Sequence, residues 1–430
     1  MGPVFFAASE AAPPLWMVLP FVLLLFLIAA APLVLPRFWD RHHAGVAVGL
    51  GVCTVCFYSF GLQRTAPLLH AASEYFSFLS LVGALYVVSG GILLRVRGEA
   101  TPWENCLFLF LGALLANVLG TTGASMLLVR PWIRMNKYRI TGFHVVFFIL
   151  LVSNIGGCLT PIGDPPLFLG FLKGVPFWWP LQHCWRPWIF SVGVLLVVFL
   201  VLDRRNFLRA PLPVREAQTG EEHWHIDGLW NLPLLGVVLC GLLLPFGWRE
   251  ALMLTAAGLS WRWTPKRVHG SNHFDFAPIQ EVAWLFAGIF LTMLPALEIL
   301  GAQSETLGLR TPLQFFFWTG ALSGVLDNAP TYLAFLSTAF GLARLELASD
   351  MPAFLEQHGL LLQAISLGAV FFGAVTYIGN GPNLMVKKIA EQQGVRTPSF
   401  LGYMAFFSLP LLLPLFGLVG ILCFSKWRVW

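Results

Sequence analysis

Two aspartates lie deep inside apolar stretches of this 430-residue sequence, and the residues around each of them are uncharged. Asp164 falls in the segment GCLTPIGDPP and Asp327 in LDNAPT. An ionised Asp at the centre of a bilayer costs about 2.5–3.5 kcal/mol on insertion scales. Because burial disfavours the charged form, such a carboxyl group can hold either a proton or a cation, but not both cheaply. The sequence therefore predicts competition between a proton and a cation at these residues.

Oxygen-bearing side chains accompany both aspartates. We expect the tip of each interrupted apolar segment to pair with the broken helix of its own half, which gives two separate oxygen-rich clusters. Hard oxygen ligands suit sodium or lithium better than a transition metal, and no other cofactor is expected. The candidate sodium ligands are Asp164, Asp327, Asn154 and Asn380, and the other candidate ion-binding residues are Asn328, Ser153, Thr160, Thr121, Thr122, Thr376 and Asn383.

Helix capping is the alternative role for the two aspartates. Asp164 precedes Pro165, and Asp327 precedes Pro330 by three positions, so each could be the N-cap of a following helix. A neutral Ser or Asn would cap as well without the cost of a charge, as Asn380 could do. Ion binding is therefore the preferred interpretation.

The composition requires a membrane protein. The chain is 57% hydrophobic and only 11% charged, against about 25% charged in soluble domains. These values exclude a soluble enzyme, a disordered chain and a nucleic-acid-binding protein. The fold class predicted is an all-α polytopic membrane protein. Apolar stretches fit to cross the membrane are Leu15–Leu35, Ala44–Leu62, Phe76–Leu94, Thr141–Thr160, Trp188–Leu202, Gly228–Pro245, Ala251–Trp263, Glu281–Leu300, Leu360–Ile378 and Phe400–Phe424.

Two further apolar segments, 104–134 and 312–344, are interrupted at their midpoints. The interruptions are Gly120-Thr121-Thr122-Gly123 and Asp327-Asn328-Ala329-Pro330. Each arm is about 15 residues, or roughly 22 Å of helix, which is too short to cross comfortably. We therefore predict two re-entrant hairpins, each of which returns to the side from which it entered.

The chain also contains an internal repeat. Residues 157–166 read GCLTPIGDPP and residues 373–382 read GAVTYIGNGP, and a Thr-Pro precedes each hairpin. We expect a first repeat at 1–215, with hairpin 104–134 and broken helix 141–173. A second repeat at 216–430 would hold hairpin 312–344 and broken helix 360–390. The two hairpins enter from opposite sides, which predicts inverted-topology repeats with a site at the membrane midplane.

The basic residues predict the orientation. Most of the 26 Lys and Arg residues fall on one side when both termini are placed outside and both hairpins return to their own side. We therefore expect a multi-pass protein with its N-terminus and C-terminus outside. His144, near the inner start of its span, is expected to pack rather than to relay protons.

From about Phe76 to Phe424 the chain resembles the ion transporter superfamily, and within it the NhaD-type sodium/proton antiporters and their citrate-transporter-like relatives. The resemblance is carried by SNIGGCLTPIGDPP, by LDNAPT at 326–331 and by IGNGPN at 378–383. It implies a scaffold domain, a mobile transport domain with elevator-type movement, a homodimer and a bacterial plasma (inner) membrane. Its ion-coupling residues map onto Asn154, Asp164, Asp327, Asn328 and Asn380.

The chain departs from NhaD-type sequences at the first hairpin tip. Sequences of the NhaD type look as though they carry Asp-Asn at this tip, where the present chain has Gly120-Thr121. The threonines typical just after the Asp164 position are replaced by Pro166 and Leu167. One carboxylate is thus expected in the first cluster instead of two, which leaves stoichiometry and ion selectivity open.

The preferred function is sodium/proton antiport, with sodium and protons as partners and the lipid bilayer as surroundings. The alternatives are a sodium-coupled symporter of a carboxylate such as citrate, and an arsenite or silicate carrier. Carboxylates at the site would repel an organic anion, and no arginine lies mid-membrane to offset them. No nucleophile–base pair or metalloprotease motif indicates an enzyme.

Overall fold

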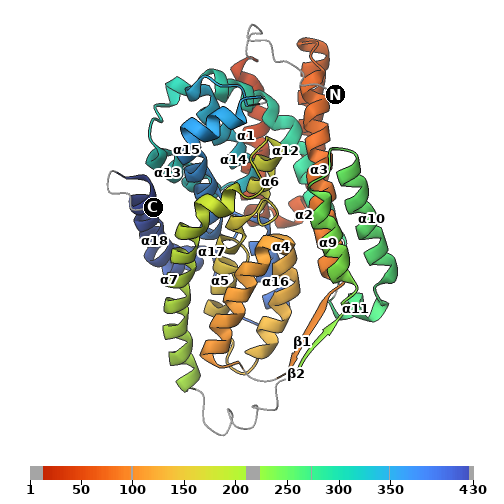
Figure 1. Cartoon of the computed structure of the whole chain (residues 1–430), viewed down its shortest axis with the longest axis vertical. Coiled ribbons are helices and arrows are strands. Elements are labelled where there is room, and N and C mark those ends of the chain that lie inside the picture. Colours follow the sequence, from red (N-terminus) through yellow and green to blue (C-terminus); the bar gives the residue numbers. More distant parts are fainter. Residues whose placement is uncertain (1–12, 98–99, 210–222, 273, 348, 426–430) are drawn as a thin grey trace.

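The computed structural model describes residues 13–97, 100–209, 223–272, 274–347 and 349–425 (Figure 1). Helices dominate this part of the chain. Nine of its helical segments are long and apolar enough to cross a membrane, which makes this a multi-pass membrane protein of α-helices. These segments are Leu15–Pro32, Pro36–Gly61, Ala66–Gly90, Pro102–Met135, Gly142–Leu159, Trp179–Arg209, Ala277–Ala302, Met351–Val375 and Phe400–Phe424.

The first half of the chain runs from the N-terminal helices to a long helix that ends at residue 209. Its elements are η1 Leu15–Val18, α1 Leu19–Val34, α2 Pro36–Cys56, η2 Phe57–Gly61, α3 Ala66–Gly90, β1 Leu93–Arg97, α4 Pro102–Met135, α5 Gly142–Leu151, η3 Ile155–Leu159, α6 Pro165–Leu172 and α7 Trp179–Arg209.

The second half begins with a short strand that pairs antiparallel with β1. Its elements are β2 His223–Asp227, α9 Asn231–Gly241, α10 Trp248–Trp263, α11 Lys266–Ser271, α12 Ala277–Ala302, η4 Ser304–Leu307, α13 Pro312–Ser323, α14 Asn328–Ala343, α15 Met351–Phe372, η5 Gly373–Val375, α16 Gly381–Gln392, α17 Phe400–Tyr403, η6 Met404–Leu412 and α18 Leu413–Phe424.

Helix α4 folds back on itself at Gly120. That glycine has φ 74° and ψ 155°, a backbone conformation that residues with a Cβ rarely adopt. The two ends of α4 meet, because the Ala100 amide donates to the Met135 carbonyl at 3.2 Å. Toward the open end of the hairpin, the rings of Phe108 and Trp132 stack with centroids 5.5 Å apart. The predicted chain reversal in segment 104–134 is therefore present as a helical hairpin.

Helices α13 and α14 form a second hairpin. The chain turns between Ser323 and Asn328, and the rings of Phe315 and Phe335 meet across the arms with centroids 6.2 Å apart. Each hairpin starts with a reciprocal cap at a Thr-Pro, Thr101 with Glu104 in the first and Thr311 with Gln314 in the second. In Figure 1, α4 lies in the lower half of the molecule and α13–α14 in the upper half.

The two broken helices cross the centre in opposite directions. Helix α5 rises to η3 and continues as α6, whereas α15 descends to η5 and continues as α16 (Figure 1). Glycines permit both breaks. A Cβ on Gly163 would lie 2.1 Å from the Gly157 carbonyl oxygen, and a Cβ on Gly379 would lie 2.7 Å from that of Gly373. Only glycine allows these backbones to come so close.

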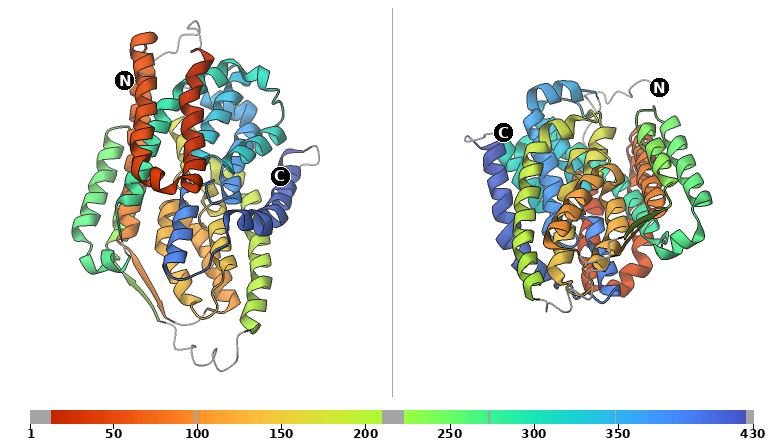
Figure 2. Two further views of the ribbon diagram at one scale, coloured as in Figure 1. Left: turned by 180° about the vertical axis from the view of Figure 1, so that it is seen from behind. Right: turned by 60° about the horizontal axis from the view of Figure 1, so that its bottom comes forward.

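The long helix α3 lies at one side of the hairpins and broken helices. It packs against α4, α9, α10 and α12, and α12 packs in turn against α1 and α2 (Figure 2). At the spans expected at Gly228–Pro245 and Ala251–Trp263 the structure has α9, with 11 residues, and α10, with 16. At 1.5 Å per residue they span about 17 and 24 Å, less than the hydrocarbon core.

Candidate functional site

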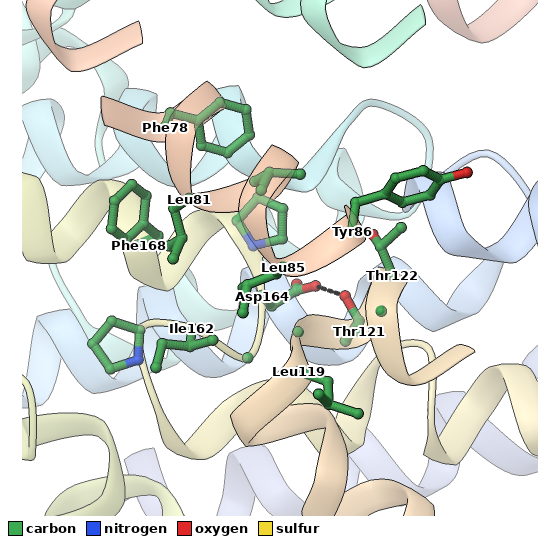
Figure 3. A pocket seen from close by; sticks show the side chains of 16 residues that line it. Phe78, Leu81, Leu85, Tyr86, Leu119, Thr121, Thr122, Ile162, Asp164 and Phe168 are labelled. Atoms are coloured by element: carbon green, nitrogen blue, oxygen red, sulfur yellow. Dashed lines mark hydrogen bonds between the residues drawn. The ribbon is translucent and has the colours of Figure 1, made fainter. Parts of the chain in front are cut away.

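Asp164 lies at the centre of the molecule and is 1% exposed. Its carboxylate accepts three hydrogen bonds from side chains. Thr121 Oγ1 and Asn380 Nδ2 donate to Oδ1 at 2.8 and 3.0 Å, and Asn328 Nδ2 donates to Oδ2 at 2.6 Å. Figure 3 shows Asp164 facing Thr121 at the tip of the α4 hairpin. A buried carboxylate with three donors is well solvated by the protein.

These donors come from both halves of the chain. Thr121 belongs to the first hairpin, Asn328 to the tip of the second and Asn380 to the second break. The sequence predicted two separate clusters, one for each half. The structure instead joins them into one cluster around Asp164, because the tips of both hairpins and both helix breaks meet at the same point.

Asp327 lies differently, although it too directly precedes a helix. It is the N-cap of α14, and its Oδ1 accepts a hydrogen bond from the backbone amide of Ala329 at 3.0 Å. Asp164 is in the N-cap position of α6, but its side chain makes no capping hydrogen bond there. The capping role considered for both residues therefore applies to Asp327, and the Asp164 carboxylate is turned toward the two hairpin tips and the second break.

In the described part of the chain, two buried amide oxygens of this cluster have no hydrogen-bond partner. They are Oδ1 of Asn154 and Oδ1 of Asn328. The Asn154 amide nitrogen donates to Asn383 Oδ1 at 2.7 Å, so the orientation of Asn154 is held from outside the cluster. A Cβ on Gly373 would lie 3.0 Å from Asn154 Oδ1 and 3.5 Å from Asn328 Nδ2, so both amides lie close to this glycine. Unpartnered buried oxygens are costly, and a bound cation would satisfy them.

The remaining candidate residues support the breaks more than they face the site. Thr160 Oγ1 donates to the Asn117 carbonyl at 2.6 Å, and Thr376 Oγ1 donates to the Gly324 carbonyl at 2.7 Å. Each threonine thus ties a helix break to the adjacent hairpin. Ser153 shares a hydrogen bond with Ser125 at 2.7 Å, and its carbonyl accepts one from Asn380.

A cavity opens beside Asp164 toward α3. Thr121, Thr122 and Asp164 contribute its polar groups, and the α3 side is apolar, with Phe78, Leu81 and Leu85 among its lining residues (Figure 3). Its space for water-sized molecules is about 40 Å³, enough for about three waters. No Lys or Arg lines it in the part of the chain that the structure describes.

Three short helices begin around the cluster. Asp164, Asp327 and Asn380 precede the first residues of α6, α14 and α16. A helix N-terminus carries a partial positive charge from its free amide groups. These termini favour an ionised Asp164 and would equally favour a bound anion, so the helix geometry alone does not choose between cation and anion.

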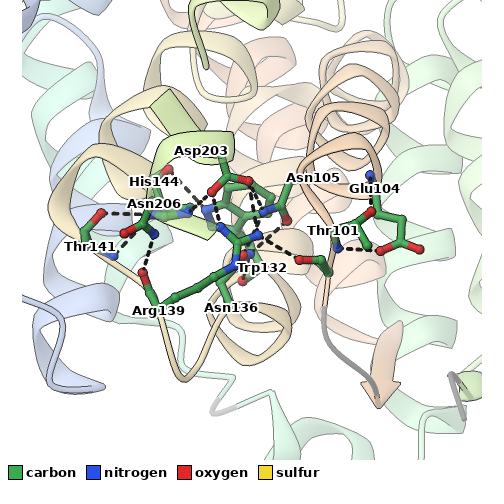
Figure 4. A network of polar contacts seen from close by, with 11 residues as sticks. Thr101, Glu104, Asn105, Trp132, Asn136, Arg139, Thr141, His144, Asp203 and Asn206 are labelled. Carbon is green, nitrogen blue, oxygen red and sulfur yellow. Dashed lines mark hydrogen bonds and ion pairs between the residues drawn. The ribbon is translucent and has the colours of Figure 1, made fainter. Parts of the chain in front are cut away.

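A second buried polar network was missed in the sequence. Asp203 of α7 is fully buried and pairs with Arg139, while His144 Nε2 lies 3.0 Å from Asp203 Oδ1 (Figure 4). Asn105 Nδ2 donates to Asp203 Oδ2 and to Asn136 Oδ1, both at 2.8 Å. The network fastens the base of the α4 hairpin to α5 and α7. The predicted span Trp188–Leu202 ends one residue before Asp203.

The comparison with known families decides the broader assignment. A family model described as "Putative citrate transport" matches residues 10–424. The chain belongs to this family.

Mycobacterial proteins are among its relatives. A "46 kDa membrane protein" of Mycobacterium leprae is 27% identical over 318 residues, which are 69% of this chain and 72% of that protein. An "Uncharacterized transporter" of Mycobacterium tuberculosis is 25% identical over 317 residues, with the same coverage of both chains. This member of the citrate-transport family is thus a membrane transporter by family, which argues against an enzyme.

Proposed function

We propose that the chain is a secondary active transporter that exchanges sodium or lithium for protons at Asp164. The observation that carries the proposal is the buried carboxylate of Asp164 in a cluster where, among the described residues, two buried amide oxygens have no partner, those of Asn154 and Asn328. These are hard oxygen ligands of the kind that bind sodium. Asn380 would complete the set by turning its amide oxygen inward, and Asp327 would hold the helix that carries Asn328.

Exchange follows from competition for one group. A cation needs the ionised carboxylate, whereas protonation of Asp164 removes that charge and leaves a neutral acid that is cheap to bury. Each occupant therefore excludes the other. Apparent sodium affinity should therefore fall as the pH falls, because a larger fraction of Asp164 is then protonated.

Inverted repeats at 1–215 and 216–430 would give this site access to both membrane faces. Several matched pairs support the proposal, since each joins the same kind of group at equivalent positions. Both breaks have a threonine hydroxyl on a hairpin carbonyl and a close pair of glycines. Both hairpins, read as re-entrant, begin with a Thr-Pro cap. An elevator-type movement, a homodimer, a plasma-membrane location and both termini outside extend the proposal through the family resemblance.

Symport of a carboxylate such as citrate with sodium is the second candidate. The family description and the three helix N-termini around Asp164 favour it. Against it stand a carboxylate at the centre of the site and a lining without Lys or Arg among the described residues. An arsenite or silicate carrier would need the same anion-binding features.

The test is sodium-induced proton movement in proteoliposomes between about pH 6 and 9. We expect a sodium-dependent signal in the wild type, its loss in Asp164→Asn, and retention in Asp327→Asn. Parallel vesicles with labelled citrate, with and without sodium, test the second candidate. Citrate uptake without sodium-induced proton movement would replace antiport by symport.

A further inference from the structure

Helix α6 meets α3 through contacts at three levels. At its N-terminal end, Asp164 faces the cavity lined by Leu81 and Leu85 of α3. One helical turn on, the rings of Phe168 and Phe78 lie with centroids 6.4 Å apart (Figure 3). The α3 residues of this interface recur every three or four positions and so form one face of that helix.

An ion pair occupies the third level, at the opposite end of α6 from Asp164. Lys173, the C-cap of α6, places Nζ 2.7 Å from Oε1 and 2.9 Å from Oε2 of Glu74 on α3. Both side chains are largely buried, with 13% and 8% exposure. His70, one turn before Glu74 on the same helix, lies 3.1 Å from Oε1.

This ion pair can control where Asp164 lies. Helix α6 has only eight residues, with Asp164 before its first residue and Lys173 after its last. A helix this short moves as a rigid rod, so fixing one end against α3 fixes the other. The other two α3–α6 contacts described above, a ring contact and a cavity, resist sliding weakly. The Glu74–Lys173 pair is thus the directional contact between the two helices.

We propose that Glu74 and Lys173 form a latch that holds α6, and with it Asp164, in the position seen in this structure. The latch must open whenever the broken helix moves past α3. The inference rests on the proposed alternating-access function, but it concerns a contact outside the ion site. Glu74 and Lys173 are positioning residues, and neither binds the transported ion.

The latch stabilises one state without making it permanent. Largely buried ion pairs gain attraction but lose hydration, so their net contribution is modest. Breaking one partner leaves the other charge unpaired in its partly buried place, which destabilises the latched state. Removing both charges, in Glu74→Gln with Lys173→Met, relieves that penalty. This double variant should therefore destabilise the latched state no more than either single variant does.

The experiment measures from which side of the membrane the cavity beside Asp164 is accessible, without using any ion. A reporter cysteine at Thr122, in the cavity beside Asp164, is labelled in vesicles by an impermeant thiol reagent from either side. The background replaces the exposed Cys53, Cys56 and Cys240 by alanine. Glu74→Gln and Lys173→Met should each change the ratio of labelling from the two sides by about fivefold, in the same direction.

Two further variants separate a latch from general damage. The exchanged pair Glu74→Lys with Lys173→Glu should restore the wild-type ratio. Lys387→Met is the matched control, because Lys387 pairs with Glu391 within the single helix α16 and should leave the ratio unchanged. Two results would overturn the latch: labelling ratios equal to the wild type in both single variants, or a neutral double variant, Glu74→Gln with Lys173→Met, whose change is the sum of the two single changes.

A chemical cross-link provides the second test. Glu74→Cys with Lys173→Cys, in the same background, should be joined by a reducible bifunctional thiol reagent about as long as the two replaced side chains, and transport should stop and recover on reduction. Transport at the wild-type rate while cross-linked would overturn the proposal. If the wild type transports neither sodium nor citrate, the proposed function fails. The labelling ratios would still show whether the Glu74–Lys173 pair controls access to the cavity.

Discussion

Asp164 and Asp327 are alike in sequence and different in the folded protein. Each is an isolated aspartate just before a short helix at the centre of the chain's fold. Asp164 is 1% exposed and accepts hydrogen bonds from three side chains on three different elements. Asp327 is half-buried and accepts a bond from a backbone amide of its own helix.

The difference shows what separates a capping carboxylate from a candidate ion carrier. A cap is satisfied locally, by the amide groups of the helix that follows it. Asp164 is satisfied by side chains that can rotate, and two buried amide oxygens nearby remain without partners. A proton or a cation can therefore change the hydrogen bonds around Asp164. At Asp327 either would have to compete with the backbone amide of Ala329 at the start of α14.

The largest effect is expected from Asp164→Asn. Asparagine has nearly the same shape but no charge, so it cannot alternate between proton and cation. Sodium-dependent transport should fall by at least about 100-fold, and the folded state should persist. Transport in proteoliposomes and thermal unfolding of the purified variant measure the two effects. Retained transport would move the coupling role away from Asp164.

The two helix breaks should differ in their tolerance of alanine. Gly163→Ala would place a Cβ 2.1 Å from a backbone oxygen, against 2.7 Å for Gly379→Ala. We expect losses of about 3 kcal/mol and about 2 kcal/mol in unfolding free energy, because backbone must shift in both cases. Gly381→Ala is the control, since nothing lies within 4 Å of its added Cβ. Equal unfolding midpoints in all three variants would mean that the breaks are not tightly packed.

Asn328→Ala tests the donors that distinguish Asp164. The change removes the 2.6 Å bond to Oδ2 and one of the two unpartnered oxygens. A hydrogen bond to a charged group is worth about 1.5–3 kcal/mol, so apparent sodium affinity should weaken at least tenfold. Asn206→Ala removes a comparable bond, to the Arg139 carbonyl at 2.9 Å, away from the site. Equal sodium affinity in the two variants would contradict a ligand role for Asn328.

The smallest effect is expected from Asp327→Asn, because asparagine is an equally good N-cap. Transport should stay within about threefold of wild type, with little change in thermal unfolding. Asp327→Ala removes the cap and should cost about 1 kcal/mol of unfolding free energy. A loss of transport in Asp327→Asn as severe as in Asp164→Asn would make the two aspartates functional equals.

Features that depend on local chemistry could be predicted from the sequence. The membrane-spanning character follows from long apolar runs, and the chain reversals follow from polar, glycine- and proline-bearing interruptions such as Gly120-Thr121. The breaks near Gly163 and Gly379 follow from the repeated motif around them, because glycine pairs and prolines interrupt a helix in any context.

Features that depend on tertiary packing could not be predicted. Nothing near Asp164 in the sequence indicates that Asn328 and Asn380 bond to it, since both lie in the other half of the chain. The capping role of Asp327 and the non-capping conformation of Asp164 depend on the same packing. The role of Asp203 could not be predicted because it directly follows an apolar run, at the place where a polar loop is expected. Only the folded structure brings it against Arg139 and His144.

Proton release on sodium addition tests the central claim most directly. Purified protein in weakly buffered detergent solution near pH 7 is mixed with sodium chloride, with choline chloride as the control, and the pH change is recorded. We expect sodium-dependent proton release from the wild type and from Asp327→Asn, and none from Asp164→Asn. Release from Asp164→Asn equal to that of the wild type would contradict the account.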